Sequence, residues 1–457
     1  MSGLLDSLSL AARSLDAQRM GLDVAGQNLA NLNTEGYTRR RLELAELAAT
    51  DRSNAGRGVE VIGVRALRDQ YVEGRLRQEQ QGTSRDAAIA ESLGVVESAF
   101  GLPGQSVDAA MTSFFDSFAA LAIDATSSEA RDGVLVQGQL VASSFNQMSD
   151  RLVSAGREAD NAVRSGVDEL NALSSRIGLL NSKIATATGA EVESLRDQRA
   201  VALSSLAELA NVTVTSRSDG MVDVSLGQGN PLVMGSTAYP LGITTSSISG
   251  MASILSQGTD ITAEITGGRI GGLLEVRDQR IPSYITRLDD LAYQMATEVN
   301  TRHQAGFDAN GAQGLTFFNI PATSAGAAAM IAVNPTVAAD SKLVAASSTG
   351  AAGDNQTAQA IAGLRDARVL NGGTATPSDL WAELVYRVGA DVSTARASHD
   401  SRQLVVDQLQ RVRDSVSGVS VDEEAAMLMK FQRAYEANAR YFGTISSVMD
   451  SLMRMVG

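Results

Sequence analysis

Cysteine is absent from this chain of 457 residues, which excludes disulfides, thiolate metal ligands and a cysteine nucleophile. Aromatic residues make up 4% of the sequence and there are only 7 prolines, a composition that favours long helices over extensive sheet. The two histidines, His303 and His399, have no second histidine at metal-ligand spacing, and no nucleophile-elbow sequence is present. We therefore expect no metal site, no cofactor and no catalytic residue.

Basic residues are in the minority, with 38 Lys and Arg against 52 Asp and Glu and a net charge of -14. Nucleic-acid binding is not indicated, because neutralising phosphates requires clustered cations. The densest basic run, Arg39 to Arg41, is interpreted as a solvated loop. No apolar run approaches the roughly 20 residues of a membrane-spanning helix. The opening residues, MSGLLDSLSLAARSL, lack the basic leader and apolar stretch of a secretory signal.

Two stretches resemble parts of known ligand sites. Residues 307–311, Phe-Asp-Ala-Asn-Gly, are similar to the start of a calcium loop, but the closing glutamate is missing and a turn is expected. Residues 267–272, Gly-Gly-Arg-Ile-Gly-Gly, lack the Gly-Lys-Ser/Thr ending of a phosphate-binding loop, so a flexible turn before a helix is expected. Neither stretch indicates an enzyme.

Apolar residues recur every seven positions at both ends of the chain, which predicts that an N-terminal and a C-terminal helix pair as a coiled coil. At the start of the second helix, the acids Asp422, Glu423 and Glu424 suit the positive helix end, and we assign them only that capping role. The first repeat consists of Leu8, Leu15, Leu22 and Leu29, with Leu4, Ala11, Ala25 and Leu32 as most of the interleaved second set. The second consists of Val421, Leu428, Tyr435, Phe442 and Met449, with Phe431, Ile445 and Leu452 between them.

The middle of the chain has helical periodicity that is longest over 134–184, where a single rod-like helix or a helical hairpin is predicted. A second long run over 378–418 is the expected partner of that helix. The fold is thus expected to be mainly α with a minor β part: a long-helix bundle carrying a small β-hairpin subdomain around 211–235, with its turn at Asp219-Gly220. The expected domains are a terminal coiled coil (1–60 plus 418–457), a helical bundle (61–306 plus 374–417) and a loop-rich excursion (307–373).

The stretch after the first helix, Asn28 to Tyr37, reads NLANLNTEGY and ends the helix with an unusual density of Asn, Thr and Gly. Together with the following arginines, residues 30–41 resemble the Asn-x-x-Thr-x-Gly-Tyr motif of flagellar rod, hook and hook-associated proteins. Residues 168–235, 271–318 and 417–442 are similar to the hook-associated protein 1 family, so the resemblance covers most of the chain in order.

This resemblance implies a structural, non-enzymatic subunit of the bacterial flagellum at the junction between hook and filament. The implied partners are further copies of the chain in a ring, the hook protein on one side, and the third hook-associated protein and filament on the other. It also implies export without a cleavable signal through the flagellar type III channel to an extracellular position, and an export chaperone on the C-terminal helix. Many members carry a β-rich outer domain, in whose place this chain has only residues 319–373. The alternative is another axial subunit, flagellin-like or the third hook-associated protein.

The expected assembly interface consists of the two apolar repeats together with the motif that follows the first helix. We expect Asn28, Asn31 and Asn33 to hydrogen-bond to backbone or to neighbouring subunits, Thr34 and Gly36 to allow a sharp chain exit, and Tyr37 to act as an aromatic anchor.

Overall fold

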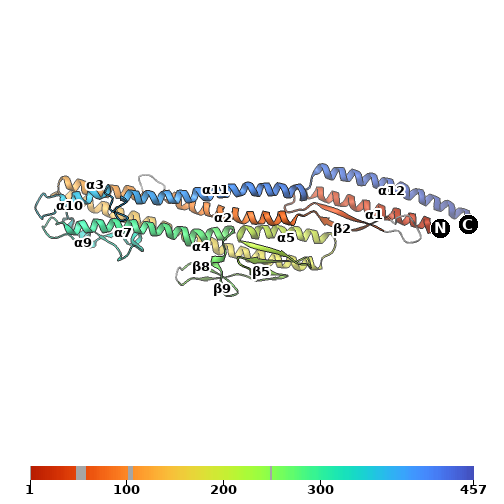
Figure 1. The fold of residues 1–457 in the computed structure, drawn as a ribbon, viewed down its shortest axis with the longest axis horizontal. Helices are drawn as coiled ribbons and strands as arrows, with labels where there is room; N and C mark the ends of the chain where they lie inside the picture. The colour runs from red at the N-terminus through yellow and green to blue at the C-terminus, as the bar shows by residue number, and fades with distance from the viewer. Residues whose placement is uncertain (1, 48–57, 101–105, 248–249, 457) are drawn as a thin grey trace.

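The computed structural model describes residues 2–47, 58–100, 106–247 and 250–456. Long helices run along the axis of an elongated molecule, and the two ends of the chain lie at the same tip (Figure 1). The prediction of a mainly α fold with paired terminal helices and small sheets is confirmed. Part of the expected N-terminal domain, residues 48–57, lies outside the described residues.

The terminal part is built from α1 (Ser2–Ala30) and α12 (Val421–Val456), which pack along each other. A hairpin of β1 (Arg40–Glu46) and β2 (Val59–Ala66) lies against α1 (Figure 1). The hairpin was not predicted, although residues 59–66 include the β-branched Val59, Val61, Ile62 and Val64, which favour strands. The terminal part is therefore a pair of helices with the two-stranded β1–β2 hairpin packed against α1.

The bundle contains α2 (Gln70–Phe100), α3 (Val107–Ile123), α4 (Ser128–Thr186) and α5 (Ala190–Leu209). It is completed by α6 (Gly268–Glu275), a π-helical turn (Val276–Arg280), α7 (Ile281–Ala305) and α11 (Pro377–Ser417). Of the two alternatives for 134–184, the structure shows the single helix, 59 residues long. The expectation that 378–418 pairs with this helix is wrong: α11 packs along α2, a helix that the sequence patterns did not reveal.

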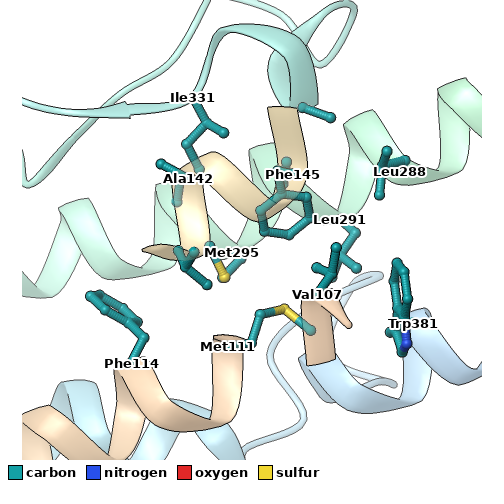
Figure 2. Close-up of a cluster of buried hydrophobic side chains, with 14 of the residues drawn as sticks. Val107, Met111, Phe114, Ala142, Phe145, Leu288, Leu291, Met295, Ile331 and Trp381 are labelled. Carbon is teal, nitrogen blue, oxygen red and sulfur yellow. The ribbon is translucent and has the colours of Figure 1, made fainter. Parts of the chain in front are cut away.

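A large cluster of buried hydrophobic residues lies where α3, α4, α7 and α11 meet (Figure 2), at the end of the rod far from the termini (Figure 1). Phe114 and Phe118 of α3 contact each other edge to face, with ring centroids 5.3 Å apart. Both rings also contact Phe317, which brings the segment after α7 into the core. Figure 2 labels Val107, Met111, Phe114, Ala142, Phe145, Leu288, Leu291, Met295, Ile331 and Trp381.

Two of the four small sheets in the described residues lie beside α4 and α5 (Figure 1). The predicted hairpin is present as β3 (Val212–Ser216) and β4 (Val222–Leu226), with Val214 opposite Val224. It continues into β5 (Asn230–Met234) and β6 (Thr237–Ala238). A three-stranded sheet of β7 (Gly242–Thr245), β8 (Ala252–Ser256) and β9 (Thr259–Asp260) was not predicted.

The segment 307–373 consists of short elements that pack on the bundle, chiefly on α3, α4 and α7. They are β10 (Phe318–Asn319), α8 (Ala327–Met330), β11 (Ala332–Val333), α9 (Pro335–Ala339) and α10 (Gln356–Ala362). Residues 307–311 form the expected turn, in which Asp308 accepts hydrogen bonds from the backbone N–H groups of Asn310 and Ala312. By contrast, residues 268–275 form α6 itself rather than a turn before it.

Candidate functional site

The two terminal helices run antiparallel with a shared seven-residue register. Asn28 of α1 hydrogen-bonds Glu424 of α12. Gly21, seven residues before Asn28 in α1, faces Phe431, which is seven residues after Glu424 in α12. This register is the one that a heptad repeat produces when two helices pack side by side.

Small residues are among the most buried positions of α1, including Ala11 and Ala25 of the predicted second set, whereas the predicted leucines are more exposed. Ala17, Gly21 and Ala25 are buried, whereas Leu22 is half-buried and Leu29 is 37% exposed. Small residues let the helix backbones approach, and larger side chains of α12 then fill the gap. Of the other predicted repeat residues, Leu8, Leu15, Leu428, Phe431, Phe442 and Met449 are half-buried, Ile445 is buried, and Val421, Tyr435 and Leu452 are exposed.

The side chain of Asn28, only 1% exposed, is the centre of a hydrogen-bond network at the end of α1. Its Nδ2 donates to the backbone oxygen of Arg40 (2.9 Å) and to Oε2 of Glu424 (3.0 Å). Its Oδ1 accepts from the backbone N–H of Arg40 (3.0 Å) and from the hydroxyl of Tyr37 (2.9 Å). The two donor hydrogens and both acceptor sites of the amide are all used, so this position is specific for asparagine.

Arg39 links the same network to both ends of the connection between α11 and α12. Its Nε donates to Oε1 of Glu424 at 2.7 Å, its guanidinium also pairs with Glu423, and its backbone N–H donates to the oxygen of Ser417 at 2.9 Å. Glu424 is 2% exposed, so its role exceeds the helix-capping one expected for it. The interpretation of the arginine run as a solvated loop is wrong for Arg39 and Arg40.

Arg40 continues the network to α5 of the bundle. Its Nη2 lies 3.4 Å from Oδ2 of Asp197, whose Oδ1 lies 2.5 Å from Nη2 of Arg68. The Arg40 guanidinium also lies over the Tyr37 ring, 5.0 Å from its centroid, a cation–π arrangement. Burial raises the pKa of the Tyr37 hydroxyl, and the charge of Arg40 opposes that rise. We call Asn28, Tyr37, Arg39, Arg40, Asp197 and Glu424 the joint.

The rest of the motif shapes the loop that precedes the joint. Gly36 has a φ of +74°, and a Cβ at this position would lie 2.2 Å from Cγ2 of Val201 in α5, so the site requires glycine in both conformation and space. Asn31 donates to the backbone oxygen of Gln27 at 2.9 Å and accepts from Thr34 at 3.2 Å. Asn33 is exposed.

The joint connects α1, α12 and α5 through hydrogen bonds and ion pairs, and its residues are not arranged as a catalytic site. The charged groups of the joint are already paired, and an ordered network of this kind fixes the position of one element relative to another. In the described ranges, no group of three or more His, Asp or Glu residues is arranged to hold a metal ion. Nor does any described helix combine the length and apolarity needed to cross a bilayer.

Three family models match the chain in order. The model of the flagellar hook-associated protein FlgK helical domain matches residues 93–318. The flagella basal body rod protein model matches residues 8–38, and the flagellar basal body rod FlgEFG protein C-terminal model matches residues 413–455. The first rod model thus covers most of α1 and the motif after it, and the second covers the end of α11 and nearly all of α12.

Curated relatives match over the full length. Flagellar hook-associated protein 1 of Escherichia coli (strain K12) is 26% identical over 549 residues, covering 100% of both chains. That of Bacillus subtilis (strain 168) is 26% identical over 504 residues, covering 100% of this chain and 99% of the relative. Because this chain has 457 residues, the alignment over 549 leaves 92 positions without a counterpart here.

Among solved structures, the flagellar hook junction protein FlgK from Burkholderia pseudomallei has the same fold. The TM-score is 0.68 at 18% identity, covering 75% of this chain and 100% of that chain.

Proposed function

The chain belongs to the flagellar hook-associated protein 1 family, and we propose on that premise that it is a structural subunit of the junction between hook and filament, assembling through α1 and α12. The observation that carries the proposal is the apolar surface that this helix pair leaves uncovered. Leu29, Tyr435 and Leu452 from the predicted repeats are exposed, and Met453 is 70% exposed. An apolar surface of this kind is stabilised when a partner covers it.

The partners that would cover this surface are further copies of the chain, arranged as a ring. The hook protein would lie on one side of the ring, and the third hook-associated protein and the filament on the other. Before assembly, the exposed residues of α12, Met429, Tyr441 and Val448 among them, would be the binding surface of an export chaperone. The subunit would reach its extracellular position through the flagellar type III channel, and no catalytic step is involved.

The joint would set the angle at which the terminal helix pair leaves the bundle. Its hydrogen bonds connect α1, α12 and α5, so the assembling helices and the bundle would move as one unit. Residues 307–373 would stand in place of the larger outer domain of other members. The domain division would then be the terminal coiled coil, the bundle and this reduced segment.

The test is to delete the gene in the parent bacterium and restore it with an epitope-tagged copy. We expect immunoelectron microscopy to place the tag at the boundary between hook and filament, and the deletion strain to release filament subunits into the medium. Label along the filament would support the alternative of a flagellin-like subunit. Label at the filament tip alone, or no link to the flagellum, would also contradict the proposal.

A further inference from the structure

A cleft of about 730 Å³ lies beside the joint, between α2, β2, α5 and the β3–β4 hairpin. Its lining contains far more positive charge than the composition of this acidic chain suggests. Six arginines contribute to it, against three carboxylates, Glu73, Glu193 and Asp219. The arginines are Arg65, Arg68, Arg77, Arg196, Arg199 and Arg217.

Arg199 is the most deeply placed of these cations, with only 8% of its surface exposed. Its Nη1 donates to Oδ1 of Asn181 (2.8 Å) and to the backbone oxygen of Gly220 (2.9 Å), both of which are neutral. Burial and the positive charges of Arg196 and Arg68 lower the pKa of Arg199 to about 10, so the guanidinium is still charged at neutral pH. A buried cation beside other cations is stabilised by an anion that comes close to it.

The carboxylates around the cleft are already engaged by other arginines. Arg196 pairs with Glu193 at 2.6 Å, and Arg217 pairs with Asp219 at 3.1 Å. Asp197, next to the cleft, is shared between Arg68 and Arg40 of the joint. Arg77 has only Glu73 at 3.9 Å, and burial lowers its pKa despite that neighbour. The cleft therefore contains one arginine, Arg199, with no carboxylate at ion-pair distance in the described chain, and a second, Arg77, whose one carboxylate contact is long.

We propose that this arginine cleft binds a carboxylate side chain of a second copy of this chain, and that Asp422, at the start of α12, supplies it. Guanidinium groups bind carboxylates through paired, charge-assisted hydrogen bonds. A second copy of the chain is a ready source of carboxylates, because the chain has 52 Asp and Glu against 38 Lys and Arg. Asp422 is exposed and forms no ion pair within the described ranges.

The position of the start of α12 along the rod also favours this partner. The cleft residue Arg68 bonds Asp197, Asp197 bonds Arg40, and Arg40 and Glu424 share Asn28. This series of contacts places the cleft and the start of α12 at nearly the same position along the long axis of the rod. A neighbouring subunit packed side by side in a ring would place its own Asp422 at the same position along that axis. The inference rests on the proposed function, because it takes the neighbour to be another ring subunit.

The first experiment tests the cleft in the purified monomer, independently of assembly. Inorganic phosphate is the probe, titrated at constant ionic strength while the melting temperature is recorded. We expect phosphate to stabilise the wild type and the control Arg157→Gln, which changes an exposed arginine of α4, and to stabilise Arg77→Gln less than half as much. Equal stabilisation of all three proteins would overturn the assignment of an anion site.

The second experiment identifies the source of the carboxylate. In cells that carry only the variant gene, Arg77→Glu should reduce the protein retained on purified flagella severalfold, while the amount exported into medium plus flagella stays constant. Adding Asp422→Arg to the same gene should restore retention, and Arg157→Glu should retain the wild-type amount. Normal retention of Arg77→Glu, or failure of the reversal to rescue it, would overturn the role of Asp422. If wild-type protein is itself absent from the junction, the proposed function fails instead, and the phosphate result still stands.

Discussion

The ring of Phe431 in α12 lies directly over the backbone of Gly21 in α1. A Cβ atom at position 21 would lie 2.5 Å from Cε1 of this ring, closer than any normal contact. Glycine at this position allows the antiparallel pair to close around an aromatic side chain. The contact therefore defines the register of the two helices as firmly as the hydrogen bond between Asn28 and Glu424.

Gly21→Ala should loosen the terminal helix pair, because the added methyl group forces the Phe431 ring out of its place. Overpacking of this kind costs about 1–3 kcal/mol. We expect faster hydrogen exchange of the α1 amides, measured by mass spectrometry. Gly26→Ala is the matched control in the same helix: its Cβ would meet nothing within 4 Å, so exchange should slow, since alanine favours helix by about 1 kcal/mol. Slower exchange in Gly21→Ala would contradict the packing described.

Asn28→Ala should destabilise the joint more than any other change within the motif. It removes four hydrogen bonds and deprives the buried Glu424 carboxylate of one donor, for an expected loss of about 2 kcal/mol or more. Circular dichroism should show an earlier unfolding step.

The control for this change is Asn33→Ala, which alters an exposed residue of the same loop and should shift unfolding by less than about 0.5 kcal/mol. The single tryptophan, Trp381, is buried in the bundle and reports on it separately. A tryptophan transition that shifts as far as the circular dichroism signal would mean that the joint and the bundle unfold as one unit. Equal effects of the two substitutions would argue against a special role for Asn28.

His303 should make the bundle sensitive to mild acid. Its Nδ1 lies 2.6 Å from the backbone oxygen of Leu315, and its Nε2 accepts from the backbone N–H of Ala345 at 2.9 Å, so the folded protein holds the neutral ring. Burial, with Arg131 adding to it, lowers the pKa of His303 to about 4. Between about pH 6.5 and 4 the unfolded chain binds a proton that the folded chain excludes, so stability falls by about 1.4 kcal/mol per pH unit.

This pH dependence is measured by urea unfolding at several pH values with Trp381 fluorescence. The contribution is fully present above pH 6.5 and is lost as the pH falls toward 4. His303→Gln should be less stable at pH 7.5 but show a shallower decline, whereas His399→Gln should retain the wild-type slope. Identical slopes in all three proteins would show that His303 does not carry this effect.

Gly272→Ala should destabilise the contact between α6 and α2. A Cβ at this position would lie 2.4 Å from the backbone oxygen of Arg85, and backbone cannot move aside as a side chain can. We expect a loss of about 3 kcal/mol in the free energy of unfolding, seen by Trp381 fluorescence. Gly74→Ala, in the facing helix α2, is the control, since its Cβ would meet nothing within 4 Å. A loss below that of the control would refute close packing at Gly272.

Several elements could be predicted because their signals are local. The seven-residue spacing of Leu8 to Leu29 and of Leu428 to Met449 predicted the paired ends, and Asp219-Gly220 between alternating valines predicted a hairpin. The helix α2 was missed, since its long Gln- and Arg-rich segment has little apolar periodicity and is held by neighbours on several sides. The β1–β2 hairpin was not predicted, and its alternation of Val59 and Val61 is interrupted at Ile62, where the pairing with β1 shifts register.

By itself, the sequence determined the helical class, the two apolar repeats and the glycine-bearing exit at Gly36, because periodicity and backbone conformation depend on residues close together in the chain. Only the tertiary structure decided that Asn28 meets Glu424, 396 residues away, and that Arg40 meets Asp197. It also decided that Ala17 and Gly21, which lie outside the predicted repeats, join Ala25 on the buried face of α1. Pairings across such distances depend on how whole helices pack, and no local pattern encodes them.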